Sequence, residues 1–261
     1  MRLDVYLAEK GFFDTRTKAK QAVERGEVYI DGKQANKASA EMIWEKNYLI
    51  ERVCEEDFVS LGGFKLSKAI KDFGINVEGL CAADVGASTG GFTDCLLKNG
   101  AKRVYAVDLN DGLLHNRLKL DDKVVSVIKN AKDLERGDFG ERIDFLTADL
   151  SFISATLVLP VFYNLLDSGA HVVLLIKPQF ENERRIRCKN GVIKDKKIIK
   201  AACKKVYEAA TGCGFLPIDV TCAPLHKDKN VELLILLKKE KGEIPLFDDF
   251  IIKAFDKKYD N

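Results

Sequence analysis

Segments typical of strands and of helices alternate through most of this chain, from Phe58 to about residue 237. Seven apolar runs have the length and composition of strands, and they span 80–85, 103–107, 124–128, 143–148, 170–176, 215–222 and 231–237. The helical patterns between them include 63–73, 92–99, 154–166 and 196–212. This alternation predicts a mainly parallel sheet with helices on both faces. Asp228–Lys229–Asn230 leave little room for a crossover helix, so the last two strands should form an antiparallel hairpin.

A glycine-rich loop follows the first of these strands. The stretch Asp84–Phe92 places an acidic residue at the strand end, then three glycines within six positions (Gly86, Gly90 and Gly91), then the start of a helix. Glycines in such a turn let the backbone approach a ligand next to a helix N-terminus. By itself the loop suits a nicotinamide dinucleotide, S-adenosylmethionine (SAM) or a phosphate.

Polar residues stand at the ends of the next three strands. Asp108 ends the second strand, where a carboxylate can accept hydrogen bonds from ribose hydroxyls, and Asn130 follows the third strand within reach of an adenine edge. Asp149 follows the fourth strand. Because the carboxyl ends of parallel strands form one ligand-binding edge, these residues predict a nucleoside site. A Rossmann-like seven-stranded sheet with an antiparallel last strand resembles the class I SAM-dependent methyltransferase fold, which favours SAM among the three ligands.

Two charged residues lie in strongly apolar surroundings. Lys177 directly follows the run Val172–Ile176, and Glu232 stands between Val231 and Leu233. Burying a charge costs free energy unless the group is paired or has a functional role. On these two residues alone, a structural salt bridge between them and a catalytic role are equally open.

The first fifty or so residues form a unit of their own. The pattern predicts a helix over 15–23, ended by Arg25–Gly26, and a strand over Val28–Ile30 that leads into the tight turn Asp31–Gly32. With Arg2–Leu3–Asp4 at its start, this α+β unit resembles the S4 RNA-binding domain. Its candidate RNA contacts are Arg2, Arg16, Lys18, Lys20, Arg25 and Lys33. Interleaved acidic residues leave a solvated surface as the alternative. We assign residues 1–57 to this domain and a short linker, and residues 58–261 to the larger domain.

Four segments of the larger domain resemble the TlyA family. They are Phe58–Leu66, Asp84–Phe92, Ala148–Ser154 and Lys177–Glu181. Members of that family are 2′-O-ribose methyltransferases of ribosomal RNA, often labelled hemolysins, in which an S4 domain precedes an FtsJ/RrmJ-like methyltransferase domain. The resemblance spans nearly the whole chain. It implies SAM-dependent methylation of a ribose, that of cytidine, in 16S rRNA, 23S rRNA or both, with S-adenosylhomocysteine (SAH) as the second product.

The resemblance also implies roles for particular residues. The family's catalytic Lys-Asp-Lys-Glu set falls on Lys65, Asp149, Lys177 and Glu232. Its cofactor contacts fall on Gly86, Ser88, Gly90, Phe92, Asp108 and Asn130, and we add Asp84, Gly91 and Asp149 from their places at the same edge. Leu61 departs from the family, in which an arginine usually follows the serine, and this could weaken a phosphate contact beside Lys65.

Charge suggests how the catalytic set would act. A ribose 2′-hydroxyl is a poor nucleophile, so its proton must leave as the methyl group transfers in line from the sulfonium. Lys177 is the candidate base, because burial, Lys65 and the sulfonium favour its neutral form, while Asp149 and Glu232 oppose that change and hold its orientation. Lys65 would stabilise the developing alkoxide or the adjacent phosphate. Alignment of oxygen, methyl and sulfur should supply most of the acceleration.

A second basic segment directly follows the Lys177 motif. Between Glu181 and Lys200, eight cationic residues face three anionic ones. This favours an RNA-gripping edge with Arg184, Arg185 and Arg187 as candidate contacts, and a solvated loop is the alternative.

Composition and residue spacing also bear on the location of the protein, on metal binding and on the C-terminal segment. The N-terminus has no apolar signal region and no window approaches eighteen apolar residues, so we expect a cytoplasmic protein without membrane spans. The seven cysteines and three histidines have no ligand-like spacing, and we predict no metal site. Residues 246–256 predict an amphipathic helix; docking on the body is favoured, and binding to a partner is the alternative.

Two other functions stay open on the sequence. One is an NAD-dependent oxidoreductase with an accessory domain, which a comparison of SAM and NAD binding would test. The other is a non-catalytic RNA-binding or membrane-active hemolysin-like protein. The expected partners are ribosomal RNA or the 30S and 50S subunits. The sequence does not identify the nucleotide, the subunit or the oligomeric state.

Overall fold

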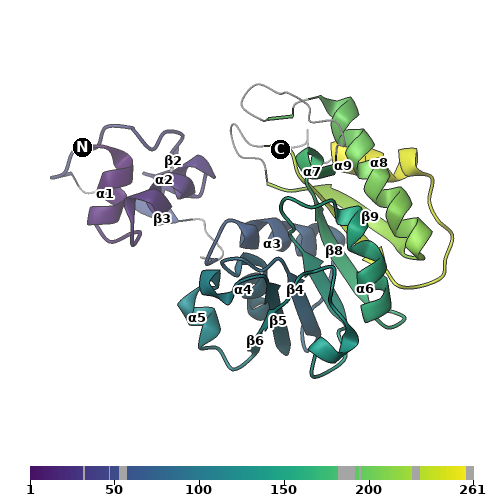
Figure 1. Ribbon diagram of the computed structural model, residues 1–261. Coiled ribbons are helices and arrows are strands. Elements are labelled where there is room, and N and C mark those ends of the chain that lie inside the picture. Colours follow the sequence, from purple (N-terminus) through teal and green to yellow (C-terminus); the bar gives the residue numbers. More distant parts are fainter. Residues whose placement is uncertain are drawn as a thin grey trace. The chain divides into compact units, whose positions relative to one another are not determined.

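A computed structural model of the 261-residue chain describes residues 1–31, 33–46, 48–52, 58–181, 192–193, 195–224 and 230–256. The chain divides into two compact units, Met1–Asp57 and Phe58–Asn261 (Figure 1). Each unit has its own core and is described by itself.

The N-terminal unit packs two helices on a small sheet. Its elements are α1 (Leu3–Glu9), α2 (Arg16–Glu24), β1 (Val28–Ile30), β2 (Lys33–Gln34) and β3 (Ile50–Arg52). The strands pair antiparallel in the order β2-β1-β3. Thr15 caps α2 by accepting a hydrogen bond from the Lys18 N–H at 3.2 Å, which is why the helix begins at Arg16. The predicted helix and the strand at Val28–Ile30 are confirmed.

The larger unit contains a seven-stranded sheet in the order β6-β5-β4-β7-β8-β10-β9 (Figure 1). The strands are β4 (Cys81–Val85), β5 (Arg103–Asp108), β6 (Val124–Ile128), β7 (Phe145–Ala148), β8 (His171–Ile176), β9 (Leu216–Cys222) and β10 (Leu233–Lys238). β10 runs antiparallel to both of its neighbours, and the pairs from β6 to β8 are parallel. The predicted hairpin of the last two strands is therefore confirmed, and with it the reversed last strand.

Helices cover both faces of this sheet, as predicted. They are α3 (Gly62–Phe73), α4 (Gly91–Lys98), α5 (Asn116–Lys119), α6 (Leu159–Leu165), α7 (Pro178–Glu181), α8 (Lys196–Cys213) and α9 (Phe247–Asp256), with short 3₁₀ helices η1 (Asp111–Leu113), η2 (Arg136–Asp138) and η3 (Ala155–Leu157). The helix predicted over 154–166 is thus two elements, η3 and α6. Pro160 lies in the first turn of α6, where its missing N–H costs no hydrogen bond, and this favours a new helix start there.

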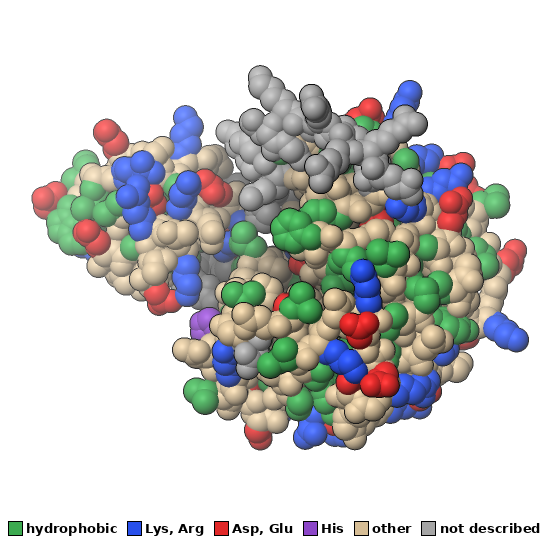
Figure 2. Space-filling model, viewed as in Figure 1, with side chains coloured by type: hydrophobic (Ala, Val, Ile, Leu, Met, Phe, Trp, Pro, Cys, Tyr) green, Lys and Arg blue, Asp and Glu red, His purple; other side chains and the backbone are tan. Residues whose placement is uncertain are grey.

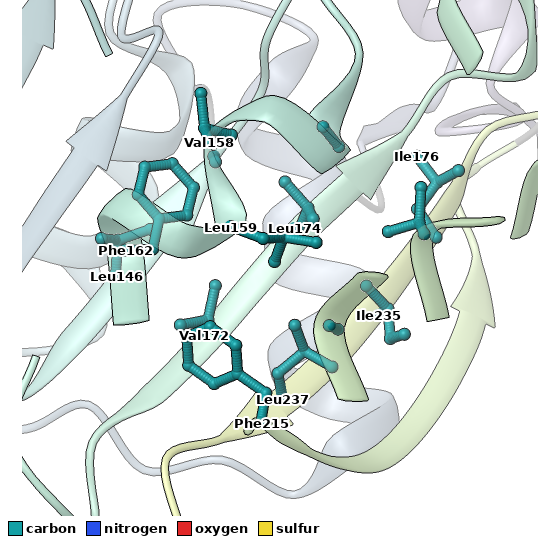
Figure 3. Packing of buried hydrophobic residues seen from close by; sticks show 14 of the residues in the cluster. Leu146, Val158, Leu159, Phe162, Val172, Leu174, Ile176, Phe215, Ile235 and Leu237 are labelled. Atoms are coloured by element: carbon teal, nitrogen blue, oxygen red, sulfur yellow. The ribbon is translucent and has the colours of Figure 1, made fainter. Parts of the chain in front are cut away.

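Side chains of the central strands alternate between two cores. From β8, Val172, Leu174 and Ile176 belong to one buried cluster, and Val173 and Leu175 belong to the other. Residues of α6, α8 and α9 complete the first cluster, part of which is seen in Figure 3, and residues of α3 and α4 complete the second. The sheet is buried on both sides, which explains its long apolar runs.

The C-terminal helix α9 docks on the body of the larger unit. Phe250, Ile251 and Ala254 are buried in the first core, and the Cys222 thiol donates a hydrogen bond to the Ala254 carbonyl at 3.2 Å. The apolar face that the sequence predicts for this helix is therefore covered by β9 and its neighbours.

Candidate active site at the carboxyl edge of the sheet

The loop between β4 and α4 has room only for glycine at several positions. Gly86 has φ +85°, and a Cβ there would lie 2.6 Å from the Asp149 carbonyl oxygen. Gly90 has φ +92°, and its Cβ would lie 2.2 Å from a Leu118 methyl. A Cβ on Gly91 would lie 2.8 Å from the Gly63 amide nitrogen. These glycines let neighbouring protein segments approach the loop, so their need is not explained by a ligand alone.

Two cavities open beside this loop, both within the larger unit. The first, of about 520 Å³, is lined by Gly86, Gly91, Phe92 and the four residues Lys65, Asp149, Lys177 and Glu232, among others. The second, of about 580 Å³, is lined by Ser88, Asp108, Asn130 and a set of apolar side chains that includes Leu109 and Leu113. Gly86, Ser88, Asp149 and Ser151 line both cavities. The two spaces therefore adjoin along one wall.

Two lysines and two carboxylates meet in the first cavity. Lys177 Nζ lies 2.6 Å from Asp149 Oδ1, and Lys65 Nζ lies 2.7 Å from Glu232 Oε2. Lys65 Nζ is also 3.8 Å from Asp149 Oδ2, which links the two pairs. The salt bridge between Lys177 and Glu232, which was one of two possibilities on the sequence, is therefore not formed: each of these residues pairs with another partner. Lys177 also donates a hydrogen bond to Ser151 Oγ at 2.8 Å.

The sheet topology explains why these four side chains converge. Asp149 and Lys177 directly follow β7 and β8, and Glu232 directly precedes β10. Since β10 is antiparallel, with Leu233 paired to Ile176, its beginning lies at the edge where β8 ends. Lys65 comes from the first turns of α3. All four side chains are partly or largely buried, and Lys177 is only 10% exposed.

Asp84 is not in either cavity, which corrects its prediction as a cofactor contact. Its side chain is fully buried and accepts hydrogen bonds from Thr93 Oγ1 at 2.7 Å and from Thr147 Oγ1 at 3.1 Å. Thr93 belongs to the first turn of α4, so Asp84 holds the helix that follows the loop. Burial raises the pKa of Asp84 to about 7, although the two threonine hydrogen bonds act against that shift.

Asp108 and Asn130 do line the second cavity, as the sequence predicts. Asp108 accepts hydrogen bonds from the Ser88 N–H at 2.8 Å and from the Leu109 N–H at 2.7 Å. Ser88 has φ +50°, so this carboxylate stabilises a backbone conformation that side chains other than glycine rarely adopt. Asn130 Oδ1 accepts from the Lys132 N–H at 3.0 Å. Both side chains are therefore held in place at the cavity wall.

Several residues of the two cavities and their surroundings were not predicted from the sequence. Phe152 has φ +66°, is 91% exposed and lies with its ring centroid 5.3 Å from that of Phe180. Gln179 lines the first cavity, and its buried Oε1 has no hydrogen-bond partner within the described part of the chain. Ser151 orients Lys177. All lie within the motifs Ala148–Ser154 and Lys177–Glu181, which were the available signal. Leu61, where an arginine was expected, also lines the first cavity.

The predicted RNA contacts of the N-terminal unit differ in how they are held. Lys18 and Lys20 make exposed ion pairs with Asp14 and Glu24 on or beside α2, and Lys33 is exposed in β2. Lys and Arg side chains are interspersed with Asp and Glu on the face of this unit that Figure 2 shows. Arg2 and Arg16 both contact Asp4.

Arg25 corrects the prediction, because its side chain is only 15% exposed and donates to Glu27 at 2.8 Å. Arg25 is therefore engaged in a local, largely buried ion pair and is poorly placed to reach a ligand. Arg184, Arg185 and Arg187 lie outside the described residues.

Among the described residues, the structure has neither a cluster of metal ligands nor a membrane-spanning helix. No group of three or more His, Cys, Asp or Glu side chains is arranged to hold a metal ion there. No helix in the same ranges is long and apolar enough to cross a membrane.

Comparison with known proteins matches both units. The sequence pattern of the FtsJ-like methyltransferase family fits residues 58–240, and that of the S4 domain fits residues 1–41. The chain is 40% identical over 241 residues to Hemolysin A of Brachyspira hyodysenteriae, covering 90% of this chain and 98% of that protein. It is 34% identical over 241 residues to the 16S/23S rRNA (cytidine-2′-O)-methyltransferase TlyA of Mycobacterium tuberculosis, covering 92% and 90%.

A solved structure covers the whole chain. It is a protein from Streptococcus thermophilus described provisionally as a hemolysin, with 34% identity, a TM-score of 0.70 and coverage of 100% of this chain and 98% of that one.

Proposed function

Because the chain belongs to the FtsJ-like methyltransferase family and carries an S4 domain, we propose that it methylates the ribose 2′-oxygen of a cytidine in ribosomal RNA, with SAM as methyl donor. The observation that carries the proposal is the set of two lysines and two carboxylates in the first cavity, of which Asp149 also lines the adjoining second cavity. A relative that is 34% identical bears the name of this activity. We propose the cytoplasm as its location, since ribosomes are there. Membership in a methyltransferase family shows the nicotinamide alternative to be wrong.

The residues of the two cavities fit the proposed cofactor. Asp108 offers carboxylate oxygens to a ribose, Asn130 offers an amide to a base edge, and Leu109 and Leu113 supply apolar contacts for an adenine ring. Gly86 and Ser88 belong to both cavities and can follow a ligand from one into the other. When bound, SAM supplies a methyl group on a sulfonium centre and leaves as the thioether SAH.

Lys177 is the residue that we propose to take the proton of the 2′-hydroxyl. Its Nζ is held between Asp149 Oδ1 and Ser151 Oγ, so the direction in which it can accept a proton is set before the substrate arrives. Asp149 then stabilises the protonated lysine. With SAM bound, the methyl group would pass from sulfur to the ribose oxygen, and Lys177 would hold the proton that leaves the hydroxyl.

Lys65 and Glu232 hold the other side of the same cavity. Glu232 Oε2 lies 2.7 Å from Lys65 Nζ and holds this lysine in place. The ammonium group of Lys65 is the one that we propose to stabilise the negative charge on the attacking oxygen or on the adjacent phosphate. The exposed ring of Phe152 lies beside Phe180, whose ring centroid is 5.9 Å from Lys177 Nζ, and it offers a flat apolar face to a nucleobase.

The test is transfer of labelled methyl from SAM to isolated 30S subunits, 50S subunits and protein-free rRNA, followed by mapping of the modified nucleotide. We expect label on a cytidine ribose. In the same assay Lys177→Ala should abolish transfer while SAM still binds in calorimetry. Lys102→Ala is the matched control, because Lys102 is an exposed lysine paired with Glu141 at 2.6 Å. Full activity of Lys177→Ala would overturn the assignment of the base.

A further inference from the structure

A fully buried aspartate lies at the start of α1 in the N-terminal unit. Asp4 accepts hydrogen bonds from Arg2 Nε and Nη2 at 3.0 Å each, and from Arg16 Nε at 2.9 Å. The Val5 N–H donates to it as well, at 3.0 Å. Burial alone would raise the pKa of Asp4, but the hydrogen bonds and charges of the two arginines outweigh burial and hold it below its usual value. The carboxylate is therefore ionised, and both of its oxygens accept hydrogen bonds from within the protein.

Arg2 and Arg16 are about half exposed to solvent, although the aspartate that they contact is buried. Their side chains are 48% and 57% exposed, whereas Asp4 is 1% exposed. A guanidinium has five N–H groups, and within the described part of the chain Asp4 takes two from Arg2 and one from Arg16. The remaining donors of both guanidinium groups have no hydrogen-bond partner among the described residues. Two cations on one anion also leave a net charge of about +1 at this point of the surface.

The backbone that carries these side chains is fixed on both sides. The Leu3 and Asp4 N–H groups donate to the Ala40 and Ala38 carbonyls at 2.8 and 2.9 Å, and Arg2 forms an antiparallel bridge with Glu41. Arg16 is the first residue of α2, whose start is set by the Thr15 cap. The other cations of α2 have weaker restraints, since exposed lysine pairs such as Lys18–Asp14 hold their side chains only loosely.

We propose that Arg2 and Arg16 form a preorganised site for the phosphodiester backbone of RNA, and that Asp4 is the positioning residue that holds both guanidinium groups without touching the RNA. The inference rests on the proposed function, because it assigns a role within RNA binding by the S4 domain. A planar guanidinium fixed on one side presents its other N–H groups to phosphate oxygens in a set direction. Less side-chain freedom is then lost on binding.

The decisive variant is Asp4→Asn, because positioning and simple charge predict opposite signs. Removing a negative charge makes this face more positive, so attraction to RNA through charge alone should strengthen binding. If Asp4 positions the arginines, the same change should raise the Kd for protein-free 16S and 23S rRNA about tenfold. Glu9→Gln is the matched control, since Glu9 is an exposed residue of the same helix and the substitution changes the charge equally. Asp4→Asn binding as tightly as Glu9→Gln would overturn the proposal.

Two further measurements keep the test decisive. Trp44 is the only tryptophan of the chain, and its ring centroid lies 5.8 Å from that of Tyr6 in α1. The fluorescence emission of Trp44 therefore reports whether the N-terminal unit is folded. If Asp4→Asn does not fold, the double variant Arg2→Lys with Arg16→Lys takes its place, because it keeps both charges but loses the planar fork. Weaker RNA binding then supports the proposal, and unchanged binding overturns it.

The steady-state readout separates this proposal from the proposed function. Asp4→Asn should raise the KM for rRNA about tenfold and leave kcat for methyl transfer unchanged, because the four residues of the active-site cavity are untouched. If the wild-type protein neither binds nor methylates rRNA, the proposed function fails. If the wild-type protein does both and Asp4→Asn matches it, only the positioning role fails.

Discussion

Each unit contains an aspartate placed between two cations, and the two arrangements differ in nearly every other respect. In the N-terminal unit Asp4 is buried and holds two half-exposed arginines that come from nearby positions in the sequence. In the larger unit Asp149 lies between two largely buried lysines, Lys177 at 2.6 Å and Lys65 at 3.8 Å. Glu232 balances the second lysine, so the four charges there sum to zero.

The difference between the cations separates binding from chemistry. A guanidinium stays charged at all accessible pH values, so arginines fixed by Asp4 can hold a phosphate but cannot accept a proton. An amine can lose its proton when its surroundings change, which suits Lys177 to act as a base. The same carboxylate-and-two-cations arrangement therefore serves a binding role on a surface and a catalytic role in a cavity.

The largest test of this contrast exchanges the cation in the cavity. Lys177→Arg keeps the positive charge beside Asp149 but removes the group that can take a proton. We expect methyl transfer to fall about 10²–10⁴-fold, the range typical of a lost general base, with SAM binding retained. Single-turnover transfer to rRNA and calorimetry with SAM measure the two quantities. An arginine variant with near wild-type rates would mean that Lys177 acts by charge alone.

The second test concerns a carboxylate that is held by hydroxyl groups. Asp84 has hydroxyl partners, and its pKa of about 7 lies well above the ordinary value of 3.8, whereas the pKa of Asp4 is lowered by its arginines. A carboxyl group whose pKa is higher in the folded state binds its proton more tightly there. The folded state is therefore stabilised at low pH and loses stability as the pH rises from about 4 to about 7, by at most about 4 kcal/mol.

Asp84→Asn removes this titration. The difference in unfolding free energy between Asp84→Asn and wild type should therefore move in favour of the variant between pH 4 and 7 and stay constant above pH 7 to 8. Urea denaturation at a series of pH values measures it, and other titrating groups cancel in the difference. Parallel profiles across this range would show that Asp84 does not hold a proton in the folded protein.

A third test concerns a carboxylate that joins the segments following Asp149 and Lys177. Glu181 is buried and accepts hydrogen bonds from Ser154 Oγ at 2.6 Å and from the Ala155 N–H at 2.7 Å, so it ties the segment after Asp149 to the segment after Lys177. Glu181→Ala should lower kcat about tenfold to 100-fold, since small displacements of reacting groups have effects of this size.

The conservative variant distinguishes positioning from general damage. Glu181→Gln keeps a carbonyl oxygen for the Ala155 N–H and should recover most of kcat, with the KM for SAM unchanged in both variants. Steady-state rates over a range of SAM concentrations measure this. Equal losses in the two variants would contradict a role based on hydrogen bonds.

The smallest expected effect sharpens the comparison within the N-terminal unit. Arg25 is paired with Glu27 and largely buried, unlike Arg2 and Arg16. Arg25→Gln should therefore change the Kd for rRNA by less than about twofold while lowering the unfolding free energy by about 1–3 kcal/mol. Filter binding and urea denaturation followed by Trp44 emission check the two expectations. A large loss of RNA binding in a folded Arg25→Gln protein would return Arg25 to the RNA contacts.

Much of the fold follows from local patterns. Apolar runs and turn residues predict all seven strands of the large sheet and the antiparallel hairpin, because strand periodicity and loop length act over a few residues. The same reading predicts that Lys177 and Asp149 stand at strand ends. It misses the break between η3 and α6, because a proline tolerated in a first turn looks the same as one inside a helix.

The order of the elements, the two-unit pattern and the types of residue at the carboxyl edge of the sheet can be read from the amino-acid sequence. The pairing of Lys177 with Asp149 and of Lys65 with Glu232, the burial of Asp84 and the hold of Asp4 on two arginines depend on how the chain folds in three dimensions. The reason is that strand order and register set the distances between side chains far apart in the chain. Inserting β10 between β8 and β9 brings Glu232 to the edge where Lys177 lies, and no local pattern contains that distance.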